Sequence, residues 1–412
     1  MKIGVYFTAK KSYGGAYHYS ATFLEALSRI RGNEYYIFST SKDVPSEYRK
    51  LKNFHFVDLY SESREQIIKI RALASSIISG LFPVFFKIIY KLGLFEVFKT
   101  ITIISNKNTI NLIKSKNLDL IFYPTTSDLS FLINVPYVVT IHDLHHKLTP
   151  RFKETTAGGR REMRDYTFSN SIKNAYMLLS ESEEGKEDIL RFYKTPENKV
   201  LVLPMLPPPY LISNINEKTV KNFLAAKKIR DKYLFYPAKF WPHKNHLRII
   251  MALHRLKNYG VILDLVLTGS KDADFSTYGE VMRLADKLGV TDQIKYLGVV
   301  NNEDLSILYK GSLCLVMPTF FGATNIPVLE AWKVGTAVVY SDIRGCRNQL
   351  GDAGLLVNPK NYKDIADKIK RLYNNPRLRD ELIKKGKKRL ARWTEKDFVN
   401  KVIKLIKNYS LK

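Results

Sequence analysis

A short stretch in the C-terminal part of the chain, PTFFGATNIPVLEAW at residues 318–332, has the composition of a phosphate-binding turn. Small and turn-forming residues, which let backbone approach a ligand closely, come first: Gly322, Ala323, Thr324 and Asn325. Pro327 is expected at the first position of a helix, whose free N–H groups attract phosphates. Glu330 follows one turn inside, where a buried carboxylate needs a partner, and the two hydroxyls of a ribose would supply one.

Two lysines bracket a short, stiff segment in KFWPHKNH, at residues 239–246. Lys239 and Lys244 flank Trp241 and Pro242, and two cations on one such loop suit a diphosphate whose leaving-group charge they neutralise. The alternative is an exposed basic loop. We favour the diphosphate because the loop follows a predicted strand and is expected to face the turn at 322–327.

Other loops after predicted strands carry glycine or histidine. Gly14 and Gly15 in KKSYGGAYHYS allow a close backbone approach, but the loop is not the G-x-G-x-x-G fingerprint, so it does not support NAD binding. In HDLHH, His142 is expected to contact a substrate. The three histidines there suggest a metal, yet no second ligand group with zinc spacing accompanies them, so we predict no metal site. Gly269 in LTGS and Val299 in LGVV are placed to give backbone contacts to a nucleobase.

Composition restricts the partner classes. The chain has 412 residues, of which 66 are Lys or Arg and 39 are Asp or Glu, giving a net charge of +27. Such an excess favours nucleic acid, an anionic membrane or phosphorylated small molecules. No zinc-finger spacing, RNP-like motif or arginine-rich arm supports nucleic acid. Cys314 and Cys346 are too few for a disulfide framework, and the N-terminal residues do not have the pattern of a signal peptide. The default expectation is a cytoplasmic protein.

Residues 73–98 are strongly apolar, but Gly80 and Pro83 interrupt them and Lys87 and Lys91 lie inside. A spanning helix needs about 20 predominantly apolar residues, and charge at mid-depth is costly, so we predict no transmembrane span. The pattern suits a helix lying in the surface of an anionic membrane. A helix packed on its own domain is an equal alternative.

Apolar strands alternate with helical stretches in two rounds, which predicts two parallel, doubly wound α/β sheets. The proline-rich segment LPMLPPPYL, at 203–211, separates them. We therefore predict an N-terminal domain at 1–208, a C-terminal domain at 209–392, and a last helix at 393–412 that packs back toward the first domain. Ligands of such sheets bind beyond the carboxyl ends of the strands, which would put this one in a cleft between the domains.

These motifs, in this order, resemble the GT-B glycosyltransferases of family four, also called group 1, of the bacterial surface-polysaccharide type. The resemblance rests on IPVLEAWKVGTAVV, VTIHDL, YPAKFWPHKNH, YLGVV and the N-terminal glycine turn. It implies two Rossmann-like domains facing across a cleft and retaining transfer of a hexose from a nucleotide-diphosphate sugar, without a metal or other cofactor. GDP-mannose is the first donor to try, and a lipid-linked glycan such as O-antigen, capsule or lipopolysaccharide is the expected acceptor, at the inner membrane face.

The resemblance also assigns roles. Lys239 and Lys244 contact the donor diphosphate, Glu330 binds the ribose, and His142 lies by the transferred sugar. The glycines at 14 and 15 approach the phosphates or the acceptor. The remaining donor contacts are expected from Gly269, Val299, Gly322, Ala323, Thr324, Asn325 and Ile326.

One position departs from the family pattern. The first glutamate of its E-x7-E motif is replaced by Gly322, which offers only backbone. We expect an active variant, because both lysines, His142 and Glu330 are present. The rivals are a catalytically inactive nucleotide- or glycan-binding protein and an epimerase on the same fold.

Overall fold

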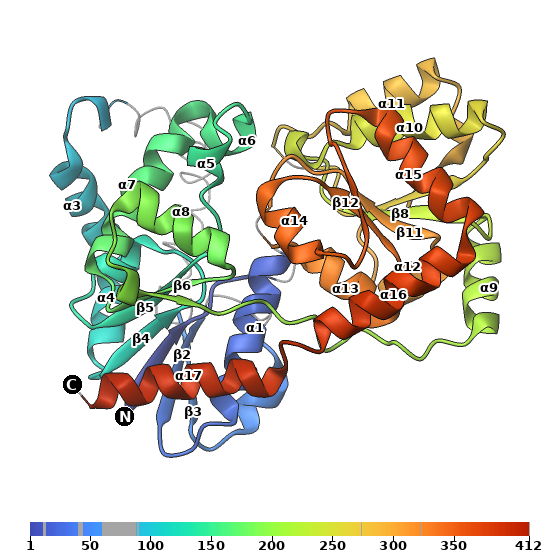
Figure 1. Cartoon of the computed structure of the whole chain (residues 1–412). Helices are drawn as coiled ribbons and strands as arrows, with labels where there is room; N and C mark the ends of the chain where they lie inside the picture. The colour runs from blue at the N-terminus through green and yellow to red at the C-terminus, as the bar shows by residue number, and fades with distance from the viewer. Residues whose placement is uncertain are drawn as a thin grey trace. The chain divides into compact units, whose positions relative to one another are not determined.

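The computed structural model describes residues 1–10, 14–39, 44–59, 88, 90–272, 274–322 and 324–411. The chain forms two compact units, Met1–Pro204 with Glu395–Lys412, and Met205–Thr394. The divisions predicted from the sequence follow residues 208 and 392. The predicted α/β class is confirmed, because each unit is a parallel sheet with helices packed around it (Figure 1).

The N-terminal unit is built on a seven-stranded sheet in the order β3-β2-β1-β4-β5-β6-β7. Its strands are β1 (Lys2–Tyr6), β2 (Glu34–Ser39), β3 (Phe54–Asp58), β4 (Leu120–Tyr123), β5 (Tyr137–Ile141), β6 (Met177–Ser180) and β7 (Val200–Val202). Its helices are α1 (Gly15–Ser28), α3 (Phe95–Ser105), α4 (Lys107–Lys114), α5 (His145–Leu148), α6 (Lys153–Thr156), α7 (Arg160–Asn174), α8 (Glu183–Tyr193) and α17 (Glu395–Ser410).

The central strands are buried along their whole length, which explains their continuous apolar sequences. All of YVVTI in β5 and LIFY in β4 are buried, as expected of strands covered on both faces. The sequence SIKNAYMLLSES at 171–182 predicts a helix that runs into a strand; β6 is that strand, but the helix before it, α7, begins earlier, at Arg160. Gly158 and Gly159, at φ 63° and 89°, precede its first turn. The first residues of the helix, RREMRD, are mostly polar and so gave no helical pattern of apolar residues.

The last helix, α17, belongs to the N-terminal unit and lies beside α1 (Figure 1). Phe398 is fully buried, and its ring centroid lies 6.3 Å from that of Tyr19 and 6.2 Å from that of Phe23. Lys401 Nζ donates a hydrogen bond of 2.9 Å to the carbonyl of Val202 at the end of β7. Aromatic burial of this kind is a large stabilising contribution.

The C-terminal unit has a six-stranded sheet in the order β10-β9-β8-β11-β12-β13. Its strands are β8 (Tyr233–Pro237), β9 (Asp264–Thr268), β10 (Ile294–Tyr296), β11 (Cys314–Met317), β12 (Val338–Ser341) and β13 (Leu355–Val357). Its helices are α9 (Glu217–Ala226), α10 (His246–Asn258), α11 (Tyr278–Lys287), α12 (Asn302–Gly311), α13 (Ile326–Val334), α14 (Arg344–Leu350), α15 (Tyr362–Asn374) and α16 (Pro376–Leu390).

All strand pairs in this second sheet are parallel, so their carboxyl ends lie at one edge. The loops that leave β8, β9, β10 and β11 therefore start close together. These are the loops that hold the lysines at 239 and 244, Gly269, Val299 and the turn before α13. Their convergence is what the doubly wound topology predicts for a ligand site.

Part of the apolar segment at 73–98 lies outside the described residues, namely 73–87 and 89. The part that is described ends in α3, whose exposed side chains include the hydrophobic Val97, Ile101, Ile103 and Ile104. Within the described ranges, no helix is both long enough and apolar enough to span a bilayer.

Candidate functional site

The loop that carries the two lysines packs against the loop that precedes α13. We call residues 239–246 the lysine loop. The backbone N–H of Phe320 donates to the carbonyl of His243 at 2.7 Å. The side-chain amide of Asn245, buried and in the left-handed conformation at φ 61°, donates to the carbonyl of Pro318 at 2.7 Å. These bonds hold two segments about 75 residues apart in the sequence against each other.

Both lysines of this loop are partly buried. The ammonium of Lys239 lies 5.2 Å from the centre of the Trp241 ring, which places a cation over an aromatic face. Burial lowers the pKa of Lys239, because it disfavours the charged form. The carbonyl of Lys244 accepts a 2.8 Å hydrogen bond from the hydroxyl of Tyr236 on β8. The backbone of the loop is thus held in place, and the loop carries both lysines.

Gly269 is pressed against the start of the lysine loop. At φ 113° it has a conformation that other residues rarely adopt, and a Cβ there would lie 3.0 Å from the carbonyl carbon and oxygen of Ala238. Its N–H donates to the carbonyl of Gly298 at 2.8 Å. The next residue in that third loop, Val299, is 80% exposed. Three strand-end loops therefore meet at this edge of the sheet.

The turn before α13 is held by side chains rather than left open. Helix α13 begins at Ile326, so Pro327 is its second residue and not its first, as the sequence analysis expected. The N–H of Asn325 donates to Oε1 of Gln349 at 3.0 Å, and Nε2 of Gln349 donates back to the Asn325 carbonyl at 3.0 Å. The Asn325 side-chain amide donates to the Tyr340 hydroxyl. The backbone N–H of Asn325 therefore already has a hydrogen-bond acceptor. The side chain of Thr324 is half-buried. Ala323 lies outside the described residues.

Gly322 has no room for the carboxylate that the family pattern places there. A Cβ at this position would lie 2.2 Å from Nδ2 of Asn325, and the residue has φ 143°. Its carbonyl accepts a 3.3 Å hydrogen bond from Sγ of Cys346. Because the Asn325 side chain is itself hydrogen-bonded, it cannot move aside without losing that bond. A glycine at position 322 therefore fits both the backbone conformation and the space beside Asn325.

Glu330 is 5% exposed in α13. The hydroxyl of Tyr309 on α12 donates to Oε2 at 2.6 Å, and that of Tyr210 donates to Oε1 at 3.4 Å. Burial raises the pKa of this carboxyl to about 7, while the two tyrosine hydrogen bonds act in the opposite direction. The carboxyl group is therefore poised between its charged and neutral forms near neutral pH.

In the N-terminal unit, His142 follows β5 and its Nδ1 is hydrogen-bonded to Oε1 of the buried Glu181, which follows β6. Burial alone would lower the pKa of His142, but the charge and hydrogen bond of Glu181, with Asp143, raise it overall. Asp143 in turn accepts a 2.6 Å hydrogen bond from Arg164 on α7. Although burial opposes it, this guanidinium is the main cause that lowers the pKa of Asp143 to about 2.

The other predicted residues of the N-terminal unit lie at the start of α1. Gly14 is the residue before the helix, with φ 59°, and Gly15 is the first helical residue. A Cβ on Gly14 would meet no atom of the described residues within 4 Å, so space beside this turn is open. His146 Nε2 lies 3.2 Å from Asp165, and its Nδ1 accepts from Arg164 at 3.3 Å. At least two of the three clustered histidines are thus paired with side chains of the same unit.

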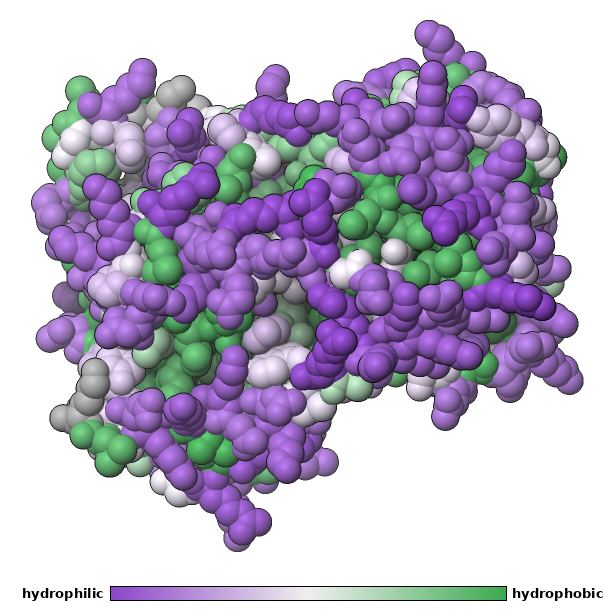
Figure 2. All heavy atoms as spheres, viewed as in Figure 1, coloured by the Kyte–Doolittle hydropathy of each residue, from purple (hydrophilic) through white to green (hydrophobic). Residues whose placement is uncertain are grey.

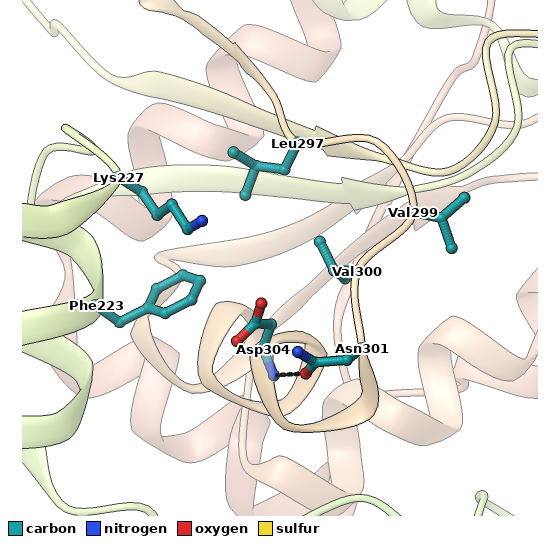
Figure 3. Close-up of a pocket in the computed structure, with 7 residues that line it drawn as sticks. All are labelled: Phe223, Lys227, Leu297, Val299, Val300, Asn301 and Asp304. Carbon is teal, nitrogen blue, oxygen red and sulfur yellow. Dashed lines mark hydrogen bonds between the residues drawn. The ribbon is translucent and has the colours of Figure 1, made fainter.

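A separate pocket of about 400 Å³ lies in the C-terminal unit (Figure 3). Phe223 and Lys227 extend from the α9 side toward Leu297 and Asp304. The complete lining is Phe223, Lys227, Leu297, Val299, Val300, Asn301 and Asp304. Of the predicted donor residues, only Val299 belongs to it.

Three residues that contact the predicted site residues, Glu181, Tyr309 and Gln349, were not predicted from the sequence. Glu181 comes directly after a strand, so the rule that ligand-facing residues follow strands would have found it. Tyr309 and Gln349 gave no such signal, because each contacts the site from a helix about 20 residues away in the sequence.

Comparison with known proteins gives these features a context. Residues 218–389 match the family model for glycosyl transferases group 1. The O-antigen chain mannosyltransferase B of Escherichia coli is 23% identical over 233 residues, which cover 56% of this chain and 60% of that protein. The O-antigen chain mannosyltransferase RfbU of Salmonella typhimurium is 26% identical over 211 residues, covering 50% and 53%. The chain thus spans little more than half of these curated relatives.

A third relative, from Campylobacter jejuni, is an N,N'-diacetylbacillosaminyl-diphospho-undecaprenol alpha-1,3-N-acetylgalactosaminyltransferase. It is 26% identical over 245 residues, covering 57% of this chain and 61% of that protein.

Among solved structures, a glycosyltransferase from Rickettsia africae superposes with a TM-score of 0.70 at 17% identity, covering 99% of this chain and 98% of that one. WaaG, a glycosyltransferase involved in lipopolysaccharide biosynthesis, gives 0.67 at 15% identity, covering 98% and 99%. Alr3699/HepE of Anabaena in complex with UDP-glucose gives 0.68 at 13% identity, covering 99% and 100%. These likenesses establish the fold: two Rossmann-like domains of the GT-B type.

Proposed function

Since residues 218–389 match the family model for glycosyl transferases group 1, we propose that this protein is a retaining hexosyltransferase of surface-polysaccharide synthesis. It moves a hexose from a nucleotide-diphosphate sugar to a growing lipid-linked glycan such as O-antigen, capsule or lipopolysaccharide. The reaction needs no metal ion, because fixed lysine charges do the work that a cation does elsewhere.

The observation that carries this proposal is the packing of the lysine loop against the segment before α13. The bonds from Phe320 and Asn245 hold the loop that carries both lysines at the edge of the sheet where Gly269 and Val299 also lie. Charge-assisted contacts to phosphate oxygens are strong, and fixed donors need no reorganisation when charge develops. A diphosphate is the ligand that this arrangement suits best.

In the proposed reaction, the bond between the sugar and the diphosphate breaks while Lys239 and Lys244 stabilise the departing charge. The acceptor hydroxyl attacks the anomeric carbon from the face that the diphosphate leaves, which gives retention. Its proton passes to the leaving phosphate. No step of this route requires the first glutamate of the E-x7-E motif, whose position Gly322 occupies.

Mannose and GDP-mannose are the first sugar and donor to test. Two relatives are named as O-antigen mannosyltransferases, which favours mannose. The Anabaena neighbour was solved with UDP-glucose, which makes the uridine donor the natural competitor. In either case the two ribose hydroxyls are proposed to meet the carboxylate of Glu330, chiefly at Oε1, where the contact from Tyr210 is long.

A lipid-linked acceptor brings the protein to a membrane surface. The name of the Campylobacter relative includes a diphospho-undecaprenol acceptor. In this chain, large exposed hydrophobic side chains gather in one described segment: Ile88, Tyr90, Leu92, Leu94, Val97, Ile101, Ile103 and Ile104. The face seen in Figure 2 is mostly hydrophilic, with hydrophobic side chains gathered in a few places, and the net charge of the chain is +27. We propose peripheral association with anionic lipid through this segment.

A thermal-shift screen tests the donor site most directly. Purified protein is heated with GDP, UDP, dTDP and ADP, and one nucleotide is expected to raise the melting temperature most, because ligands that bind only the folded state stabilise it. The matching nucleotide sugar is then assayed for release of the diphosphate, with and without EDTA. Equal rates are expected in both.

The Lys244→Ala, Glu330→Ala double variant provides the control. It is expected to lose both the nucleotide-induced shift and turnover. Full activity in this variant would rule out the proposed site. Strong nucleotide binding without turnover of any donor would instead identify a binding protein on the same fold.

A further inference from the structure

The carboxylate of Glu181 and the imidazole of His142 leave the same edge of the N-terminal sheet. Strands β5 and β6 are adjacent and parallel, with Ile141 paired to Ser180. The residues that follow this pair, His142 and Glu181, therefore emerge side by side. Nothing in the family pattern considered above includes a glutamate at this position.

The two nitrogens of His142 have different surroundings. Nδ1 is hydrogen-bonded to Oε1 of Glu181. Nε2 is buried and makes no hydrogen bond of normal distance and angle within the described residues, although the Pro124 carbonyl lies near the ring. A buried polar atom without a partner costs free energy, which points to a ligand as its missing partner. The ring of Tyr19 meets the imidazole edge-on at 5.3 Å and restricts its rotation.

The charges around the imidazole favour its protonated form. Glu181 from β6 is 6% exposed, and Asp143, the next residue in β5's loop, is paired with Arg164 of α7. The Pro124 carbonyl after β4 acts in the same direction as these carboxylates. From α1 the neighbouring group is the buried phenol of Tyr19, which is neutral. Protonated, the ring has an N–H at Nε2 to donate.

We propose that Glu181 is a positioning residue that holds His142 with Nδ1 toward the protein and Nε2–H toward a hydroxyl oxygen of the transferred sugar. This inference rests on the proposed function for the identity of the ligand. The coupling of the two side chains is independent of it. Glu181 itself does not touch the reacting atoms.

The test begins with NMR titration of the ligand-free protein labelled with ¹³C at histidine Cε1. The His142 signal is assigned from its absence in His142→Gln. In Glu181→Gln, the apparent pKa of His142 is expected to fall by about one unit or more, because a neighbouring negative charge has gone. Glu183→Gln, an exposed carboxylate in the first turn of α8, is the control and is expected to leave the titration unchanged.

Steady-state kinetics provide the second readout. Glu181→Gln is expected to lower kcat roughly tenfold or more with a smaller change in KM for the donor, since a misplaced hydrogen bond matters most in the transition state. Glu181→Asp, which keeps the charge on a shorter side chain, should recover part of both effects. If Glu181→Gln fails to fold, Glu181→Asp is used in its place in both the titration and the kinetic measurements.

An unchanged His142 titration in a folded Glu181→Gln variant would overturn the positioning role, and so would an unchanged kcat. Either result leaves the transferase proposal intact. If the wild-type protein turned over no donor, the proposed function would fail, while the titration would still decide whether Glu181 governs His142.

Discussion

The hydroxyl of Tyr309 lies 2.6 Å from Oε2 of Glu330, inside the C-terminal unit. The sequence suggested a carboxylate free to meet both hydroxyls of a ribose. Instead, one oxygen already has a short hydrogen bond from α12, and the other has only the 3.4 Å contact from Tyr210. A carboxylate oxygen can accept two hydrogen bonds, so the site has capacity left for a ligand, chiefly at Oε1.

The raised pKa of Glu330 makes stability depend on pH. In the unfolded chain the carboxyl titrates near 4.5, and in the folded chain near 7. Between these values the folded state binds more protons, so its stability falls as pH rises. We expect wild type to lose on the order of 3 kcal/mol relative to Glu330→Gln between pH 4.5 and pH 7.

Urea unfolding followed by tryptophan fluorescence measures this difference. All three tryptophans, Trp241, Trp332 and Trp393, lie in the C-terminal unit, so the signal reports on that unit. Parallel pH profiles for wild type and Glu330→Gln would contradict the assignment.

Removing either lysine of the lysine loop should weaken nucleotide binding. A hydrogen bond to a charged group contributes about 1.5–3 kcal/mol, so Lys239→Ala and Lys244→Ala are each expected to weaken nucleoside diphosphate binding roughly 10- to 100-fold. Isothermal titration calorimetry with the nucleotide found in the thermal screen measures this. Lys257→Ala, whose ammonium contacts the Gly289 carbonyl, is the matched control and should bind normally.

Restoring the family glutamate at position 322 should harm the protein. Gly322→Glu and Gly322→Ala both place a Cβ 2.2 Å from Nδ2 of Asn325 on a backbone at φ 143°. Backbone strain of this kind costs about 1–3 kcal/mol, and the displaced amide adds to it. Gly260→Ala, at φ 74° with no described atom within 4 Å of the new Cβ, isolates the backbone contribution and should cost less. A gain of activity in Gly322→Glu would show that the turn rearranges.

The exposed face of α3 should be needed for membrane association. Ile101 and Ile104 are 44% and 67% exposed, and aspartate at both positions is expected to abolish most co-sedimentation with vesicles that contain anionic lipid. Ile262→Asp, at a 53% exposed position of the C-terminal unit, is the control. Binding should weaken with added salt, since exposed charges are screened. Equal pelleting of all three proteins would exclude this face.

Shortening Phe398 should destabilise the N-terminal unit selectively. This ring is fully buried against Tyr19 and Phe23, and replacement of such a residue by alanine typically costs about 3–5 kcal/mol. Circular dichroism of Phe398→Ala should show an earlier melting transition, while tryptophan fluorescence of the C-terminal unit changes little. Leu411→Ala, at an 85% exposed position, should behave as wild type.

The sequence predicted the two sheets well because their strands are buried on both faces. Runs such as YVVTI and LIFY have no alternation and so can be recognised as central strands. The start of α7 was missed because Arg160–Asp165 has no apolar period. Its charges are satisfied by distant partners, as when Arg164 bonds Asp143.

The site itself was only partly predictable. Strand-end position is the reason that His142 and the two lysines are predicted as site residues, and the structure packs the lysine loop against the segment before α13. The side chains that occupy the polar groups there could not be foreseen. Gln349 and Tyr340 reach Asn325 from α14 and β12, and only the folded arrangement brings them together.

The position of α17 has a consequence for how the protein is made. The N-terminal unit needs Phe398 and its neighbours to cover α1, yet a ribosome adds those residues only after the whole second unit has been synthesised. The nascent first sheet therefore waits with an uncovered aromatic surface while the second unit is synthesised and folds. Chaperone demand during translation should accordingly centre on α1, even though its helix is complete within the first thirty residues.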